Sequence, residues 1–537
     1  MKNKILLILF VGCWCSSMSA QAVYLPATHQ VYQFLEKMET KGFIPGFRDA
    51  VKPLTRENIA RALMQLDSTY TELNEIEQEE LAFYKEEFFQ ELKNLQYDLL
   101  LDERWHLYQY ESTPGLFNID LIGGWSYEDR ADGKFRRSRH NGLQAYGYAG
   151  NNVGIYFYYR DNREAGTYLD NVRQLSPEPA EVVTRGLKGA IEYDDLDAQM
   201  TYQNSFMTLS VEKMHNVWGN GDRGQLILSN KSPSYPQIKL QMKLGKNVDF
   251  TYLHGWLYSG IVDSLRSFQV ADIPGQVGYR TIYKQKYIAA HMMEMTPWNG
   301  VDIAIGESEI YGSRNPELLY LIPFMFFKAG EHWMYDTDNS QMFASFDFNV
   351  ITNYNFYTSV FIDEFSMETF YRTDRQRNQV GFTVGGKSYD QFLDNSMLQL
   401  EYTRLNPWVY NHKYPDATFQ SHSVDLGHWL GQNGDLFYVG FDYQFSRSLR
   451  GGVQLESIRK GGKDSTKYQY RLPTPEFLYS PITKEQTVGI WATYEPIRDF
   501  LMDFRLYQQR FTTQESWRGK DYAKEIGFSF SMAYNVH

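Results

Sequence analysis

Cysteine is almost absent from this chain of 537 residues, which contains only Cys13 and Cys15. Both precede Ala20, where the sequence predicts cleavage of an export signal, so the mature protein has no cysteine for disulfides, thiolate metal sites or a nucleophile. A run of about 18 apolar residues is also missing, which excludes a bundle of membrane-spanning helices. The formal charge is -12, with 53 Lys+Arg against 65 Asp+Glu. No nucleic-acid binding is expected, because phosphate neutralisation needs clustered basic residues.

Residues 1–20 have the three parts of a secretory signal peptide. Lys2 and Lys4 precede an apolar stretch, and a run of small residues ends at Ala20. Cleavage is expected after Ala20 or Ala22. A membrane anchor is the alternative, but the apolar core is about half as long as a span requires. A lipoprotein modified at Cys13 would leave an even shorter apolar region. An exported, cysteine-free chain with 16% aromatic residues indicates a protein of the Gram-negative envelope.

Residues 28–104 carry the 3.6-residue period of helices. Apolar side chains recur at helical spacing before Gly42, which stands where a C-terminal cap is expected. Thr55 is the predicted N-cap of a second helix, and a third is expected over about 72–95. The acidic charge of the region is typical of solvated helix faces. We interpret it as a helical periplasmic head. A faint resemblance of residues 34–66 to half of a surface-layer-homology unit, a wall-polymer binder, is the weaker alternative.

Residues 105–537 carry a period of two instead, as strands do. Leu121 and Trp125 alternate with Asn118 and Asp120, for example. Such alternation fits a barrel wall that meets lipid outside and polar filling inside. It fits a half-buried soluble sandwich equally well.

The lengths of the connectors distinguish these two folds. Short turns are predicted near 149–152, 194–195, 245–247, 296–300, 353–355, 386–394, 446–448 and 495–499. Longer polar connectors are predicted at 128–141, 161–184, 213–235, 259–279, 308–340, 364–376, 405–434, 459–485 and 511–523. Short and long connections alternate strictly, which is typical of outer-membrane barrels, and an even strand number returns both chain ends to the periplasmic side. We predict an all-β transmembrane barrel of about 18 antiparallel strands with an N-terminal α-helical periplasmic domain.

Two of the long connectors hold the candidate site residues. The first, residues 211–230, has the G-x-G-x-x-G spacing of a dinucleotide site starting at Gly219, but no apolar helix follows it. A glycine-rich turn that permits positive φ and exposes Trp218, Asp222 and Arg223 is the better interpretation.

The second connector, residues 308–340, is too apolar for a solvated outer loop. We expect residues 316–327 to fold into the lumen as a constriction, as plugs do in large barrels. A loop that packs only on its neighbours is the alternative. The polar and aromatic candidates here are Arg314, Glu331, His332, Trp333, Asp338 and Asn339. Asp336 and Asp338 are spaced like the start of a calcium loop, but its Gly and distal Glu are missing, so no metal or other cofactor is predicted.

At these two connectors the chain resembles the capsule-assembly Wzi family, outer-membrane barrels that help retain or organise exported polysaccharide at the cell surface. The resemblance is carried by residues 211–230 with Trp218-Gly219, and by Asn315-Pro316-Glu317 leading to Glu331-His332 and Asp338-Asn339. The order of signal peptide, head and strands agrees over nearly the whole mature chain. The resemblance implies a non-enzymatic protein of the cell outer membrane whose partners are outer-membrane lipid and exported polysaccharide. We expect a monomer.

The chemistry of the connectors fits glycan binding independently. Sugar faces stack on aromatic rings, and Asp, Asn, Arg and Glu satisfy sugar hydroxyls. Trp218, Trp333, Trp408 and Trp429 all lie in long connectors beside such partners, although girdle or loop packing would also place them there. We predict glycan contacts from Trp218, Asp222, Arg223, Arg314, Glu331, His332, Trp333, Asp338 and Asn339.

Two other functional classes remain. A porin or substrate-selective channel is the main alternative, because an eighteen-stranded barrel can enclose an aqueous lumen. A hydrolase is not expected, since the sequence has no G-x-S-x-G, no H-E-x-x-H and, after cleavage, no cysteine.

Overall fold

The computed structural model describes residues 22–98, 100–112, 115–130, 133–150, 152–273, 276–365, 378–462, 468, 472–479, 482–513 and 523–536. The predicted signal peptide, residues 1–20, lies outside them. The predicted connectors at 364–376 and 511–523 lie largely outside them as well, and the one at 459–485 lies partly outside. No helix within these ranges is long and apolar enough to cross a membrane.

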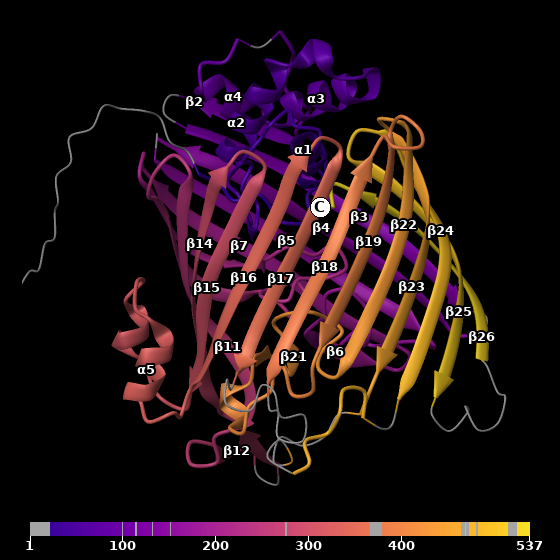
Figure 1. Cartoon of the computed structure of the whole chain (residues 1–537). Coiled ribbons are helices and arrows are strands. Elements are labelled where there is room, and N and C mark those ends of the chain that lie inside the picture. The colour runs from indigo at the N-terminus through magenta and orange to yellow at the C-terminus, as the bar shows by residue number, and fades with distance from the viewer. Residues whose placement is uncertain are drawn as a thin grey trace, which may run out of the picture.

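Eighteen antiparallel strands of the described chain close into one barrel (Figure 1). Around the wall they are β3 (Gly115–Arg130), β4 (Phe135–Ala149), β5 (Val153–Gly166), β7 (Ala190–Gln203), β8 (Met207–Met214), β10 (Tyr235–Lys243), β11 (Val248–Val262), β14 (Tyr283–Trp298), β15 (Val301–Gly312), β16 (Asn339–Ile351), β17 (Tyr354–Glu364), β18 (Gln379–Tyr389), β19 (Ser396–Leu405), β22 (Gly434–Ser446), β23 (Leu449–Lys460), β24 (Thr483–Ile497), β25 (Phe500–Thr513) and β26 (Ala523–Tyr534). β26 pairs with β3, with Tyr534 beside Gly123, and closes the wall. The predicted fold class is confirmed.

The remaining strands are short and belong to connectors or wall edges. They are β1 (Val51–Lys52), β2 (Tyr108–Ser112), β6 (Val183–Leu187), β9 (Val217–Trp218), β12 (Phe268–Ile273), β13 (Gln276–Arg280), β20 (Gln420–Ser421) and β21 (Val424–Asp425). β2 pairs with β3 and β6 pairs with β7. β1 pairs with β9, although the two are far apart in the sequence.

The short turns lie at the barrel end that carries the N-terminal helices, and the long connectors lie at the opposite end (Figure 1). We call these the head end and the loop end. One predicted turn, at 194–195, is wrong, because β7 continues through it to Gln203. Asp195 faces inward, where the Arg160 guanidinium Nε lies 2.9 Å from its carboxylate. Asp195 is therefore satisfied inside the barrel, while Asp194 is exposed on the outer face beside the Tyr159 hydroxyl.

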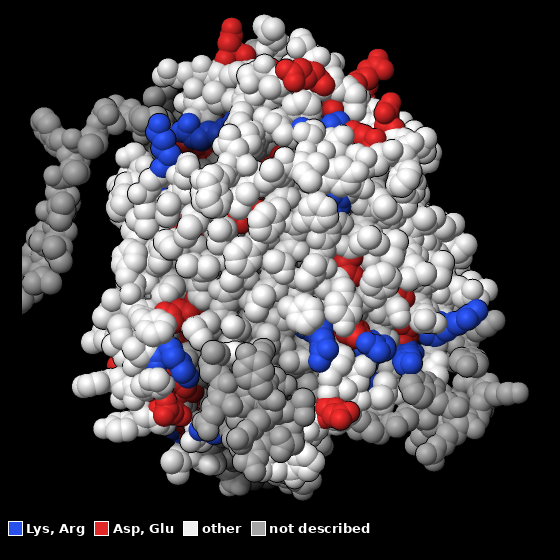
Figure 2. Space-filling model, viewed as in Figure 1, with Lys and Arg blue, Asp and Glu red and all other residues white. Residues whose placement is uncertain are grey.

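The two faces of the wall differ as the alternation predicts. Asn118 and Asp120 are buried on the inner face, whereas Leu121 is 51% exposed and Trp125 40% exposed on the outer face. Figure 2 shows a largely uncharged belt between charged side chains at the two ends of the molecule. An apolar belt of this kind suits contact with hydrocarbon.

The head contains α1 (Val31–Thr40), α2 (Arg56–Asp67), η1 (Tyr70–Glu72), α3 (Glu75–Glu87) and α4 (Phe89–Asn94). Gly42 follows α1 with φ +86°, as the predicted C-cap requires. Thr55 caps α2, with its side chain accepting a hydrogen bond from the backbone N–H of Asn58. The single helix predicted over 72–95 is wrong in detail. Asn74, not Glu72, begins α3 through a capping box, and non-helical φ and ψ at Phe88 separate α3 from α4.

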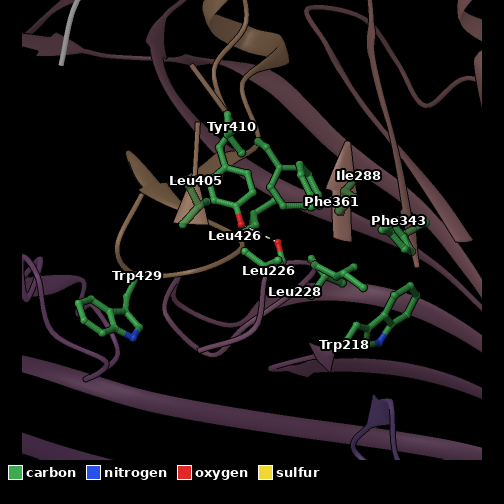
Figure 3. Packing of buried hydrophobic residues seen from close by; sticks show 14 of the residues in the cluster. Trp218, Leu226, Leu228, Ile288, Phe343, Phe361, Leu405, Tyr410, Leu426 and Trp429 are labelled. Atoms are coloured by element: carbon green, nitrogen blue, oxygen red, sulfur yellow. Dashed lines mark hydrogen bonds between the residues drawn. The ribbon is translucent and has the colours of Figure 1, made fainter. Parts of the chain in front are cut away.

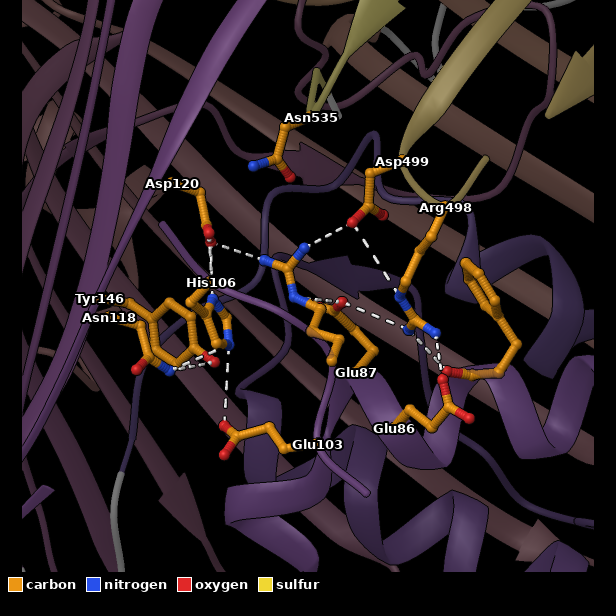
Figure 4. Close-up of polar contacts among 12 residues, drawn as sticks. Glu86, Glu87, Glu103, His106, Asn118, Asp120, Tyr146, Arg498, Asp499 and Asn535 are labelled. Carbon is orange, nitrogen blue, oxygen red and sulfur yellow. Dashed lines mark hydrogen bonds and ion pairs between the residues drawn. The ribbon is translucent and has the colours of Figure 1, made fainter. Parts of the chain in front are cut away.

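Buried ion pairs join the head to the barrel (Figure 4). The Arg104 guanidinium lies 2.8 Å from Glu87 of α3, 2.8 Å from Asp120 of β3, and 2.6 Å from Asp499 in the turn after β24. Burial by itself raises the pKa of Glu87, but Arg104 and Arg56 outweigh it and hold that pKa well below its usual range. Arg104 therefore balances three buried carboxylates at once, with Arg56, His106 and Arg498 compensating them only in part.

Replacement of Arg104 by Met is expected to loosen the head by about 3–5 kcal/mol, because it leaves buried carboxylates uncompensated. Hydrogen exchange in α3 and α4 measures this loss. Arg61→Met is the matched control. Arg61 is half exposed and pairs only with Glu57 one turn away, so we expect a cost below about 1 kcal/mol. Equal exchange in the two variants would contradict the role of Arg104.

Acid is expected to loosen the same contact. The folded pKa of Glu87 is depressed, so its stabilisation is present above its ordinary pKa of about 4.3 and is lost as the pH falls further. The protection of α3 amides, measured relative to their intrinsic exchange rate at each pH, should therefore fall on going from pH 7 to pH 3. Glu87→Gln should exchange faster at pH 7 and respond less to acid. An identical acid response in this variant would show that other groups are responsible.

Candidate functional site

The connector between β8 and β10, residues 215–234, folds back into the lumen. Its strand β9 pairs with β1 of the head segment, with Val51 beside Trp218. Trp218 is fully buried there and meets the ring of Phe343 edge-on at 6.5 Å between centroids. Apolar residues from the wall and from the connector at 406–433 complete this core (Figure 3). The expectation that the turn exposes Trp218 is wrong, because the head segment and the wall enclose it.

The glycine-rich turn has the conformation that its composition predicts. Gly219, Gly221 and Gly224 have φ of +89°, +150° and +146°. A Cβ at Gly221 would lie 2.5 Å from the carbonyl oxygen of Gly224. Glycine is required here for both backbone conformation and close approach.

Asp222 and Arg223 follow in the turn and face the lumen. Asp222 lies 2.6 Å from the Lys387 ammonium of β18, which also pairs with Glu36 of α1. Arg223 lies 2.6 Å from Glu456 of β23 and 4.5 Å from the ring centroid of Tyr438. Both side chains remain partly exposed to a cavity of about 460 Å³ that α1 and α3 bound at the head end.

Trp408 and Trp429 are buried as well: Trp429 packs in the lumen core and Trp408 stacks on Tyr479, so neither ring faces solvent. The indole N–H of Trp429 donates to the Arg223 carbonyl. Burial, with Arg223 and Lys460 nearby, lowers the pKa of His428 to about 3. The imidazole is therefore neutral at physiological pH, as its apolar surroundings require.

The second connector does not enter the lumen. Residues 313–338, with η2 (Leu318–Leu321) and α5 (Phe327–Trp333), lie against the outer surface of the wall beside β15 (Figure 1). The predicted constriction by residues 316–327 is wrong. The outer face of the wall carries His254 and Glu309 here, and the connector buries both. Apolar connector residues gain the same burial outside as inside, and outside they also cover these polar groups.

Five predicted site residues lie on that outer wall: Arg314, Glu331, His332, Trp333 and Asp338. The sixth, Asn339, begins β16 and lies on the inner face with Phe343. Asp338 accepts two hydrogen bonds from Arg314, at 2.8 and 2.6 Å, and one from Tyr320 at 2.7 Å. Glu331 is buried and accepts hydrogen bonds from Lys328 and Ser340, and Asn339 donates to the Ala417 carbonyl at 2.9 Å. His332 is 64% exposed in its side chain and Trp333 is 78% exposed. The wall thus separates the five outer residues from Trp218, Asp222 and Arg223, whereas Asn339 is on the lumen side. Glycan contacts by either group remain predictions.

Sequence reasoning missed a larger cavity, of about 800 Å³, in the loop-end half of the lumen. We call it the outer cavity. Its lining includes Arg130, Arg136, Arg160, Tyr168, Arg173, Glu181, Tyr193, Glu456, Trp491, Asp503, Arg505 and Tyr507. These residues come from β3–β5, β7, β23–β26 and the connector after β5. No local motif links them, and the available signal was the inward alternation of Asp503, Arg505 and Tyr507 along β25.

Most arginines of the outer cavity are paired, but one is not. Arg136 lies 2.9 Å from both Glu128 and Glu178, and Arg173 lies 2.5 Å from Glu164. Arg505 is exposed and forms no ion pair with any acidic side chain in the described ranges. Its guanidinium is free to bind a ligand.

Burial and the nearby Asp195 raise the pKa of Glu181 to about 8. The carboxyl is therefore largely protonated at pH 7 and adds little negative charge to the outer cavity.

The two cavities meet along one side of the barrel. Gln454, Trp491, Asp503 and Arg505 line both. The two cavities therefore lie next to each other beside β23–β25, one toward the loop end and one toward the head, while apolar side chains fill the opposite side of the lumen. Within the described residues, no group of three or more His, Cys, Asp or Glu side chains is arranged to hold a metal ion.

The family model of the capsule assembly protein Wzi matches residues 179–510. The chain belongs to the Wzi family. The structure is similar to the outer-membrane protein Wzi of Escherichia coli, described as a carbohydrate-binding β-barrel involved in group 1 capsule assembly. The TM-score is 0.60 at 13% identity, covering 96% of this chain and 100% of that one. The predicted family resemblance is confirmed, and the structural likeness shows a shared fold.

Other solved barrels are less similar. OprD of Pseudomonas aeruginosa has a TM-score of 0.42 at 11% identity, covering 78% of this chain and 94% of that one. OccD3 of the same organism has a TM-score of 0.42 at 10% identity, covering 78% and 92%. No curated protein sequence matches the chain.

Substitution of Gly221 by Ala is expected to destabilise this Wzi-family barrel by about 1–3 kcal/mol, because backbone strain adds to the 2.5 Å clash. Thermal unfolding in detergent micelles measures the change. Gly189→Ala is the control, since Gly189 also has positive φ, +70°, but its Cβ would meet no atom closer than 3.9 Å. We expect a smaller loss of about 1 kcal/mol there. Equal melting temperatures for the Gly221→Ala and Gly189→Ala variants would show that the lumen turn accommodates the added Cβ without strain.

Proposed function

We propose that this protein is a non-enzymatic, monomeric outer-membrane barrel that binds or organises capsular polysaccharide at the cell surface. The outer cavity carries the proposal, because it combines aromatic rings, mixed polar groups and an unpaired guanidinium at the loop end. Membership of the Wzi family supports the same function, as does the similar E. coli barrel, which is described as carbohydrate-binding.

The physics of the wall supports a membrane location. A closed barrel satisfies its backbone hydrogen bonds internally and has no free sheet edge, which hydrocarbon requires. Apolar side chains stand exposed on the outer face of many strands, including Phe157, Val384, Leu400, Phe437, Val488 and Phe504. In the outer membrane the short turns face the periplasm. We therefore place the head in the periplasm and the long connectors, with the outer cavity, at the cell surface.

The chemistry of the outer cavity suits a saccharide. The half-buried ring of Trp491 offers a face for sugar stacking, and the Arg505 guanidinium offers donors to sugar hydroxyls or carboxylates. The cavity continues to a second one near the head, so a chain end has room to extend inward.

A channel is the less supported alternative. The connectors at 215–234 and 406–433 fill one side of the lumen with a packed apolar core. The head covers the other end, where Lys41 of the loop after α1 lies 2.7 Å from Asp390 in the β18–β19 turn. Wide open conductance is not expected from such a lumen.

Arg505→Ala is expected to weaken binding of an oligosaccharide from the cell's own capsule about 10- to 100-fold. The loss of a charge-assisted hydrogen bond, about 1.5–3 kcal/mol, accounts for this range. Isothermal titration with the purified barrel measures the affinity, and an unchanged melting temperature excludes misfolding. Arg185→Ala is the matched control, because Arg185 is 70% exposed on β6 and lies outside the cavity lining.

The cellular test compares cell-attached with shed capsule. A strain without the gene should shed more capsule, the Arg505→Ala variant should restore attachment poorly, and the Arg185→Ala variant should restore it fully. Unchanged attachment without the gene would overturn the proposed function.

A further inference from the structure

The connector on the outer wall exposes apolar side chains away from the barrel. Tyr320 and Phe327 are buried against the wall, where they join Tyr252, Tyr287 and Tyr311 in one cluster. The connector also exposes many apolar side chains: Leu318 at 76%, Ile322 at 51%, Phe324 at 62%, Phe326 at 57%, Trp333 at 78% and Tyr335 at 89%. Phe324 stacks with one face on Phe250 of β11, and the charged or titratable exposed neighbours His332 and Asp336 flank Trp333 and Tyr335. So many exposed apolar side chains in one short segment mark an interaction surface.

The wall beneath the connector is polar where the rest of the belt is apolar. His254 of β11 and Glu307 and Glu309 of β15 point outward and are buried. The connector satisfies some of these groups directly: the Phe327 backbone N–H donates to Glu307 at 2.8 Å. The Tyr252 hydroxyl, on the same face, donates to the Tyr320 carbonyl at 2.7 Å. Charged groups on a lipid-facing wall are costly, so this stretch needs a cover.

The register shows that the covered stretch lies within the apolar belt. His254 pairs across strands with Ile238, which is 37% exposed on β10. Glu307 pairs with Met342, which is 41% exposed on β16. The covered groups are thus flanked on both sides by side chains that face outward at the same level of the wall. Whatever surrounds Ile238 and Met342 must also surround the outer side of the connector.

We propose that residues 313–338 form a lipid-embedded flap, whose exposed apolar side chains contact the acyl chains of the outer leaflet. The inference rests on the membrane location proposed above. Continuity with the apolar wall identifies the occupant as lipid. Over the polar stretch of the wall, the flap replaces lipid as the contacting material. Its own outer side then presents an apolar surface to the lipid. Trp333 and Tyr335, in the part of the flap that leads back to the start of β16, suit the boundary between acyl chains and headgroups.

Spin labels on single introduced cysteines test the flap. The only natural cysteines, Cys13 and Cys15, precede the predicted cleavage site, so the mature protein should carry one label. The variants are Phe324→Cys on the flap, Val384→Cys on the wall and Leu265→Cys in a loop-end connector, exposed by 62%, 51% and 97%. Each is reconstituted in vesicles of phosphatidylethanolamine and phosphatidylglycerol. Power saturation then compares collisions with oxygen, which enters hydrocarbon, and with a water-soluble nickel chelate.

A label at 324 is expected to behave like the label at 384, with high oxygen and low nickel accessibility, while the label at 265 shows the reverse. If the label at 324 behaves like that at 265 while 384 stays in lipid, the flap is overturned and the membrane location stands. If 384 is also open to the nickel chelate, the membrane location fails and the flap fails with it. Melting temperatures equal to that of the unlabelled protein show that each variant is folded.

Discussion

The closed ladder of backbone hydrogen bonds around the barrel is the constraint on which the rest of the structure depends. Closure by β26 and β3 leaves no free sheet edge, and it fixes which side chains face out and which face in. Eighteen strands also enclose a space that wall side chains alone do not fill. The chain therefore needs further material in the lumen. It uses the connectors at 215–234 and 406–433 from the loop end and the segment around Val51 from the head.

That material fills the lumen unevenly, and the unevenness creates the candidate site. The pairing of β1 with β9 brings head and connector together around Trp218 and builds an apolar core on one side. The other side, along β23–β25, keeps two joined cavities lined by charged and aromatic groups. Ion pairs such as Lys387 with Glu36 and Asp222 connect wall, head and connector. A rigid core beside an open polar surface is a sound arrangement for holding a polymer.

The number of strands, the confirmed fold class and the caps at Gly42 and Thr55 could be predicted because each depends on a few neighbouring residues. Errors arose where distant residues decide. The acidic pair at 194–195 suggests a turn until Arg160 of the adjacent strand is known. Residues 316–327 are equally apolar whether they fold inward or outward, and their direction depends on His254 and Glu309 of other strands. The outer cavity escaped prediction for the same reason, since its lining is spread over eight strands and a connector.

By itself, the sequence determined an exported chain with a helical N-terminal region, an antiparallel barrel and the Wzi family. Period-two alternation and turn composition are local properties, so they can be recognised in the sequence without knowing which strands become neighbours. Only the tertiary structure decided that Trp218 is buried, that Arg505 stands unpaired among the described residues of the outer cavity, and that the flap lies outside. Each of these outcomes depends on which strands become neighbours when the barrel closes, and the register of closure brings together residues from opposite ends of the chain.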